Sequence, residues 1–287
     1  MNLVVHPFLD RETFSYSYVL ANPNTGSCAI VDPVLDYDLA AGEVSTRSAE
    51  RLVEFITAND YSPEWILETH VHADHLSAAR YLKQRFVCAQ LAIGEHVHQV
   101  QAHFAREFGV DIDTDGRQFD RLLGDGERLC LGHACGRVLH SPGHTPACVS
   151  YVFDRFAFVG DTLFMPDYGT ARCDFPGGDA RALYRTVQKL YQLPAQTRLL
   201  MCHDYAPGGR DYRFCSTVAE QREHNRMLRA DTPEAEFTAA RSARDQTLAA
   251  PRLLIPAVRA NVIGGVLPGW QLEPHLQARV QTRGVAA

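Results

Sequence analysis

The sequence contains no run of about 18 apolar residues, the length that marks a candidate membrane-spanning helix. It also has no basic cluster, since 28 Lys and Arg stand against 34 Asp and Glu for a net charge of −6. We therefore expect neither a membrane span nor a nucleic-acid partner. The opening stretch MNLVVHPFLDRETFSYSYVL lacks the basic start and the long apolar core of a secretory signal, which favours the cytoplasm.

Paired cysteine motifs of the CxxC type are also missing. In a chain of 287 residues, scattered cysteines predict buried or reactive thiols in a reducing compartment rather than a disulfide scaffold. The eight cysteines stand at positions 28, 88, 130, 135, 148, 173, 202 and 215.

Apolar periodicity predicts alternating strands and helices. Residues 45–60 place Ala49, Leu52, Val53 and Ile56 at helical spacing behind a Ser/Thr-rich start that suits capping. Residues 64–69 form an apolar run typical of a buried strand. Further helices are predicted at 75–86, 94–109, 179–194, 216–230 and 232–247, and the end of the chain, 251–270, is predicted to be extended because Pro and Gly interrupt it.

Strand candidates on both sides of these helices favour an α+β fold in which sheets pack together with helices outside. We expect a single domain over 1–287, with a helical and extended segment, 216–287, packed on it. The polar helices within 216–249 are candidates for a homodimer contact, although a solvated face is the commoner explanation.

Four segments place metal-binding side chains at the ends of predicted strands: THVHADH (69–75), SPGHT (141–145), FVGDTLF (158–164) and CHDY (202–205). An extended backbone points His70 and His72 the same way, because side chains two residues apart share a face. Buried imidazoles and carboxylates need a partner that offsets their loss of hydration. The pattern therefore predicts a metal site on loops held by a rigid scaffold.

These segments resemble the metallo-β-lactamase superfamily over residues 3–205. The resemblance implies a four-layer αββα sandwich with the metal at one edge. Spacing on that fold favours two metals and a hydrolytic water between them. One metal would be held by His70, His72 and His144, the other by Asp74, His75 and His203, and Asp161 would bridge.

Three further stretches are similar to the persulfide dioxygenase branch: residues 140–153, residues 160–187 and the His-Asp-Tyr of 203–205. The tail PAVRANVIGGVLP also resembles the ending of that family. Three departures are a longer segment between Asp161 and Arg172, an expanded region at 94–125, and Cys173 in place of the family's Thr.

The resemblance implies one Fe(II), held by His70, His144 and Asp161, and a reaction of glutathione persulfide with O2 that yields sulfite and glutathione. The residues that would orient these ligands or donate hydrogen bonds are His72, Asp74, His75 and His203. The implied substrate contacts are Arg172, Tyr205 and Asp174, and Cys173 is a possible reactive thiol.

Two other functions stay open. The first is a glyoxalase II-like hydrolase of glutathione thioesters with two Zn or mixed metals. The second is a non-catalytic metal- or sulfide-binding protein, which the complete set of ligand positions disfavours because a structural site needs no open coordination position.

Overall fold

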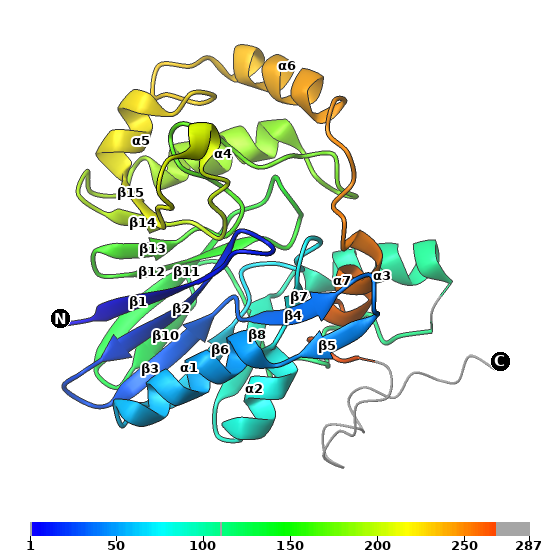
Figure 1. The fold of residues 1–287 in the computed structure, drawn as a ribbon. Coiled ribbons are helices and arrows are strands. Elements are labelled where there is room, and N and C mark those ends of the chain that lie inside the picture. The colour runs from blue at the N-terminus through cyan, green and yellow to red at the C-terminus, as the bar shows by residue number, and fades with distance from the viewer. Residues whose placement is uncertain (1, 110, 268–287) are drawn as a thin grey trace.

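The computed structural model describes residues 2–109 and 111–267. Two six-stranded sheets stack face to face, and helices cover both outer faces (Figure 1). The first sheet runs β1-β2-β3-β6-β8-β9, with bounds Val4–Asp10, Ser15–Asn22, Ser27–Val31, Ser62–Leu67, Gln90–Gly94 and Arg121–Leu123. The second sheet runs β10 to β15 in order, with bounds Arg128–Leu131, Ala134–His140, Val149–Phe153, Phe156–Phe158, Arg198–Leu200 and Cys215–Thr217.

A small third sheet and the helices complete the described part of the fold. The third sheet has the order β5-β4-β7, with bounds Glu43–Ser45, Val34–Asp38 and Leu76–Ser77. The helices α1 to α7 span Arg47–Ala58, Ala79–Arg85, Val97–Phe108, Ala180–Leu190, Val218–His224, Glu234–Asp245 and Leu254–Asn261, and a short 3₁₀ helix spans Pro207–Gly209.

Alternation along the strands builds the four layers. On β3, Ile30 faces the core under α1 and α2, whereas its neighbour Val31 faces the second sheet. On β12, Tyr151 faces the first sheet, and Val152 packs toward α4. The predicted αββα sandwich is confirmed, with α1 and α2 on one outer face and α4, α5 and α6 on the other (Figure 1).

The strongest helix predictions agree with the structure. The helix α1 buries Ala49, Leu52, Val53 and Ile56, the four positions that its periodicity marks. The helix α4 starts at the N-cap Asp179, whose carboxylate accepts a hydrogen bond from the Ala182 amide.

The prediction that residues 251–270 are extended is wrong for the helix α7. Its Pro256 lies in the first turn, where the backbone N–H has no intrahelical partner to lose. Ala257, Val258 and Ala260 are buried, so packing outweighs the interrupted pattern. The glycines Gly264 and Gly265, at φ of 75° and 77°, follow the helix, and residues 268–270 lie outside the described part.

The C-terminal segment lies against the rest of the chain wherever it is described. The helix α6 packs on α4, and α7 packs on β7. That the whole chain forms one domain stays a prediction. Within the described residues, no helix is both long and apolar enough to cross a membrane.

The expectation of free thiols throughout is wrong for one pair. Cys130 on β10 and Cys135 on β11 stand directly opposite each other in the antiparallel ladder and form a disulfide. The other six cysteines are free. Residues opposite each other across a hairpin come close enough for this bond because the ladder brings their Cβ atoms together.

We predict that the denatured, unreduced chain titrates six thiols and that reduction exposes two more. Thiol counting with and without reductant measures this, and peptide mapping should join residues 130 and 135. Eight thiols before reduction would contradict the cross-strand bond.

Candidate functional site

The predicted metal-binding side chains converge at one edge of the two stacked sheets. They come from the loops that follow β6, β11, β13 and β14. Because β3, β6 and β8 are parallel neighbours, as are β13 and β14, their carboxyl ends deliver these loops to a common edge. The structure thus gathers all seven predicted metal-site residues: His70, His72, Asp74, His75, His144, Asp161 and His203.

His70, His144 and Asp161 form one compact group. Their ligand atoms lie within 4.8 Å of one another. The Nε2 atoms of His70 and His144 stand 3.9 and 3.7 Å from the same oxygen of Asp161, which is too far for a hydrogen bond. All three residues are buried.

Hydrogen bonds on the far side of each ring set the tautomer. The Thr69 hydroxyl donates to Asp32 at 2.9 Å, so its oxygen accepts the Nδ1–H of His70 at 3.0 Å. The Nδ1–H of His144 donates to the carbonyl of Arg172 at 2.8 Å. In both rings Nε2 is therefore left with a lone pair directed at Asp161, as a metal ligand requires.

Unpaired buried atoms at this point fit a metal. Nε2 of His70 and Oδ1 of Asp161 are inaccessible and have no hydrogen-bond partner within the described residues. Such atoms are costly to bury unless something else binds them. Burial lowers the pKa of His70 well below its usual range, and the neighbouring imidazoles act in the same direction. His70 is therefore neutral and able to ligate.

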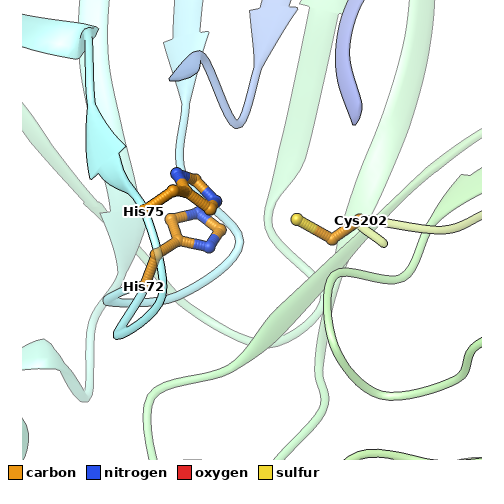
Figure 2. A group of neighbouring side chains, drawn as sticks. All are labelled: His72, His75 and Cys202. Atoms are coloured by element: carbon orange, nitrogen blue, oxygen red, sulfur yellow. The ribbon is translucent and has the colours of Figure 1, made fainter. Parts of the chain in front are cut away.

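His72 is not part of this group. Its Nε2 lies 3.1 Å from a carboxylate oxygen of Asp32 and 3.1 Å from one of Glu68. Its ring instead groups with His75 and Cys202, whose thiol points from the opposite strand end toward the two imidazoles (Figure 2). Its Nδ1 is buried and has no hydrogen-bond partner within the described residues, and the ring centres of His70 and His72 lie 4.1 Å apart.

A second set of ligand atoms lies beside the first. Asp74, His75 and His203 have ligand atoms within 4.8 Å of one another. Nε2 of His203 stands 3.2 Å from Asp74 and 3.4 Å from Asp161, and its Nδ1 pairs with the Ser15 hydroxyl at 3.2 Å. Burial lowers the pKa of His75 to about 3, which keeps the ring neutral. Its Nδ1–H donates to the Leu76 carbonyl at 3.3 Å, so the unpaired Nε2 carries a lone pair.

Asn261 at the end of α7 ties the histidine loop together. Its side-chain amide donates to the carbonyls of His72 at 2.9 Å and His75 at 2.8 Å. Its side-chain carbonyl accepts from the Ser77 amide at 2.8 Å. The residue is buried, so these bonds replace its contact with water completely. Sequence reasoning noticed Asn261 only within the tail motif.

A cavity of about 340 Å³ opens onto the metal-site residues. Its floor includes Asp74, His144 and Asp161, and aromatic side chains line its walls: Phe164, Tyr168, Phe175 and Tyr205. The mouth is formed by the turn between β1 and β2 and by the C-terminal segment from α6 to Leu253, which sequence reasoning did not place at the site. This volume lies within the range of about 300–1,000 Å³ typical of small-molecule sites.

Only two of the three predicted substrate contacts line this cavity. Arg172 and Tyr205 line the cavity, but Asp174 faces a neighbouring hollow. The guanidinium of Arg172 makes two bonds to Asp174, at 2.6 and 2.7 Å, and one to the carbonyl of Ala249 at 2.7 Å. Its charge is thus already paired, and the contact fastens the C-terminal wall of the cavity.

Cys173 lies outside this cavity. Its side chain is buried beside the Asp245 carboxylate, and burial followed by that charge raises the pKa of the thiol. A protonated, buried thiol is a poor nucleophile, so the geometry disfavours the predicted reactive role.

Residues 10–203 match the Metallo-beta-lactamase superfamily. The chain belongs to this superfamily. The match covers all the candidate metal ligands and ends at His203, so the cavity wall beyond it lies outside the shared region.

Similar proteins carry different names. A "Probable metallo-hydrolase" of Burkholderia pseudomallei is 51% identical, covering 93% of this chain and 94% of its own. "Glyoxylase B2" of Dictyostelium discoideum is 44% identical over 92% and 91% of the two chains. "Persulfide dioxygenase ETHE1, mitochondrial" of Mus musculus is more distant, at 29% identity over 77% and 76%. The persulfide dioxygenase resemblance therefore extends only to distant relatives.

A solved structure matches most of the fold. ETHE1 from Myxococcus xanthus superposes with a TM-score of 0.74 at 26% identity, covering 92% of this chain and all of its own.

We predict that Asn261→Ala destabilises the protein by about 2–4 kcal/mol, because it leaves two buried carbonyls and one buried amide without partners. Denaturant unfolding measures the change. Asn59→Ala is the matched control, since its amide also donates to a backbone carbonyl but is exposed. Equal losses for the two variants would show that the loop does not depend on Asn261.

Proposed function

We propose that the protein is an Fe(II)-dependent persulfide dioxygenase that acts on glutathione persulfide. The observation that carries this proposal is the compact group of His70, His144 and Asp161, which borders an aromatic-walled cavity, while Nε2 of His72 is bonded to Asp32 and Glu68. Two histidines and one carboxylate are the ligand set of many non-haem Fe(II) oxygenases. The likeness to persulfide dioxygenases in sequence and fold supports the same choice.

The proposed reaction is R–S–S⁻ + O2 + H2O → R–SH + SO3²⁻ + H⁺. The sulfur–sulfur bond breaks, four electrons pass from the terminal sulfur to O2, and the thiol leaves with a proton from water. A bound Fe(II) supplies the redox centre at which sulfur and O2 meet, since three protein ligands leave coordination positions free.

The chain's own residues bind the substrate and handle the proton. Phe164, Tyr168 and Phe175 give the cavity an apolar wall that excludes water from the reacting sulfur. Asp74 borders the cavity and lies 3.2 Å from Nε2 of His203. The pKa of His203 is raised well above its usual range in spite of burial, because Asp74 and Asp161 are nearby, so this pair holds a proton that it can give to the leaving thiolate. Burial, with Asp74 and Asp161 nearby, raises the pKa of Tyr205 well above its usual range, so its hydroxyl stays protonated and can donate to the substrate.

A metal-dependent hydrolase of glutathione thioesters is the second candidate. Its supporting observation is the neighbouring group of Asp74, His75 and His203, which would hold a second ion and whose His203 Nε2 lies 3.4 Å from Asp161. The names of the more similar relatives favour hydrolysis too. In that case the bound metals would supply an activated water for hydrolysis of the thioester.

Oxygen consumption separates the two functions. We expect Fe(II)-loaded protein to consume O2 on addition of glutathione persulfide and to form one sulfite for each O2 lost. An iron-replete enzyme that takes up no O2 but hydrolyses S-lactoylglutathione when loaded with zinc would overturn the dioxygenase in favour of the hydrolase. Protein stripped of metal by a chelator is the blank.

Metal content tests the ligand set. Changes beyond the direct ligands typically cost about 10- to 100-fold in metal affinity, and removing a direct ligand costs more. We therefore expect His144→Ala and Asp161→Ala to lose iron during gel filtration, whereas His203→Ala keeps close to one iron per chain. Two metals in the unmodified protein, one of them lost in His203→Ala, would instead establish the dinuclear arrangement. Elemental analysis gives the counts.

A further inference from the structure

Two arginines at the mouth of the cavity lack a countercharge. Arg244 on α6 and Arg252 between α6 and α7 both line it. Within the ranges 2–109 and 111–267, neither guanidinium forms an ion pair or a hydrogen bond. Arg244 only lies over the ring of Tyr168, with its guanidinium carbon 5.7 Å from the ring centre.

The other two cavity arginines are already occupied. Arg172 is paired with Asp174. Arg241 is buried, bonds Asp245 at 2.6 and 2.9 Å and donates to the carbonyl of Thr170 at 3.0 Å. These pairs hold the wall in place, whereas Arg244 and Arg252 keep their full bonding capacity for a ligand.

An acidic group stands at the same mouth. Glu12, in the turn between β1 and β2, borders the cavity together with Arg252, and both also border the adjoining hollow over β4 and β5. Glu12 and Arg252 thus place one negative and one positive side chain between the cavity and the hollow. This pair of charges complements the ammonium and carboxylate of an α-amino acid group. Arg244 lines the cavity but not the hollow, and it lies over Tyr168 in the aromatic wall.

We infer that Arg244 and Arg252 select a thiol-derived substrate with a carboxylate at each end. Arg252 and Glu12 bind the carboxylate and ammonium of a γ-glutamyl group, and Arg244 binds the carboxylate of the opposite, glycine end. This assignment deepens the proposed function and rests on it, because it takes the sulfur of the same substrate to reach His144 and Asp161. Arginine suits the role because its planar guanidinium binds a carboxylate through two hydrogen bonds.

Binding of an unreactive analogue tests the assignment without turnover. S-methylglutathione is titrated calorimetrically into the metal-loaded protein and into Arg244→Gln, Arg252→Gln and Arg259→Gln. Arg259 is the matched control, since it is exposed on α7 and stacks on Phe108 outside the cavity. Losing a charge-assisted pair weakens binding by about tenfold or more, so we expect that loss in the first two variants and an unchanged dissociation constant in the third.

Two trimmed analogues assign the ends. If the glycine carboxylate of the probe is converted to an amide, Arg244→Gln should no longer weaken binding, whereas Arg252→Gln still should. If the γ-glutamyl group is replaced by acetyl, the pattern should reverse. Equal effects of both variants on both analogues, or no effect of either variant on the parent probe, would overturn the assignment. Melting temperatures within the error of the unmodified protein confirm that the variants are folded.

The two proposals fail separately. An unmodified protein that binds S-methylglutathione through these arginines but consumes no O2 would keep the carboxylate contacts and reject the dioxygenase. A protein that oxidises persulfides equally well with and without carboxylates would keep the dioxygenase and reject the contacts.

Discussion

The carboxylate of Asp32 organises the site more than any single metal-binding residue does. Asp32 directly follows strand β3. Its carboxylate accepts hydrogen bonds from the backbone amide of Thr69 at 2.7 Å and the Thr69 hydroxyl at 2.9 Å, and pairs with Nε2 of His72 at 3.1 Å. Through Thr69 it sets the tautomer of His70, and its bond to Nε2 of His72 fixes the orientation of that ring. Its backbone is left-handed, with φ of 48°, a conformation that a short polar side chain tolerates better than most.

The site is assembled from both ends of the chain. The superfamily match supplies the candidate ligands, but the C-terminal segment supplies the mouth of the cavity and the Asn261 contacts. All candidate ligands thus lie within the superfamily match, whereas part of the cavity lining lies beyond it.

Sequence reasoning succeeds here where a signal is local. Helix α1 follows from its apolar spacing, and the cluster at 69–75 follows from polar residues placed at the end of a strand. It fails where the deciding contact is distant. The orientation of the His72 ring depends on Asp32 and Glu68, and α7 forms in spite of Pro256 because tertiary burial outweighs local preference. The pairing of Cys130 with Cys135 follows from the register of the hairpin formed by β10 and β11, which places the two residues opposite each other.

The position of Asn261 also bears on how the protein matures. The ribosome synthesises the chain from its N-terminus, so the β-strands and the histidine loop emerge before the helix α7. Until residue 261 has been synthesised and packed, the carbonyls of His72 and His75 lack the amide that fixes their loop. A nascent chain therefore carries every candidate ligand before the Asn261 contacts that fix their loop can form.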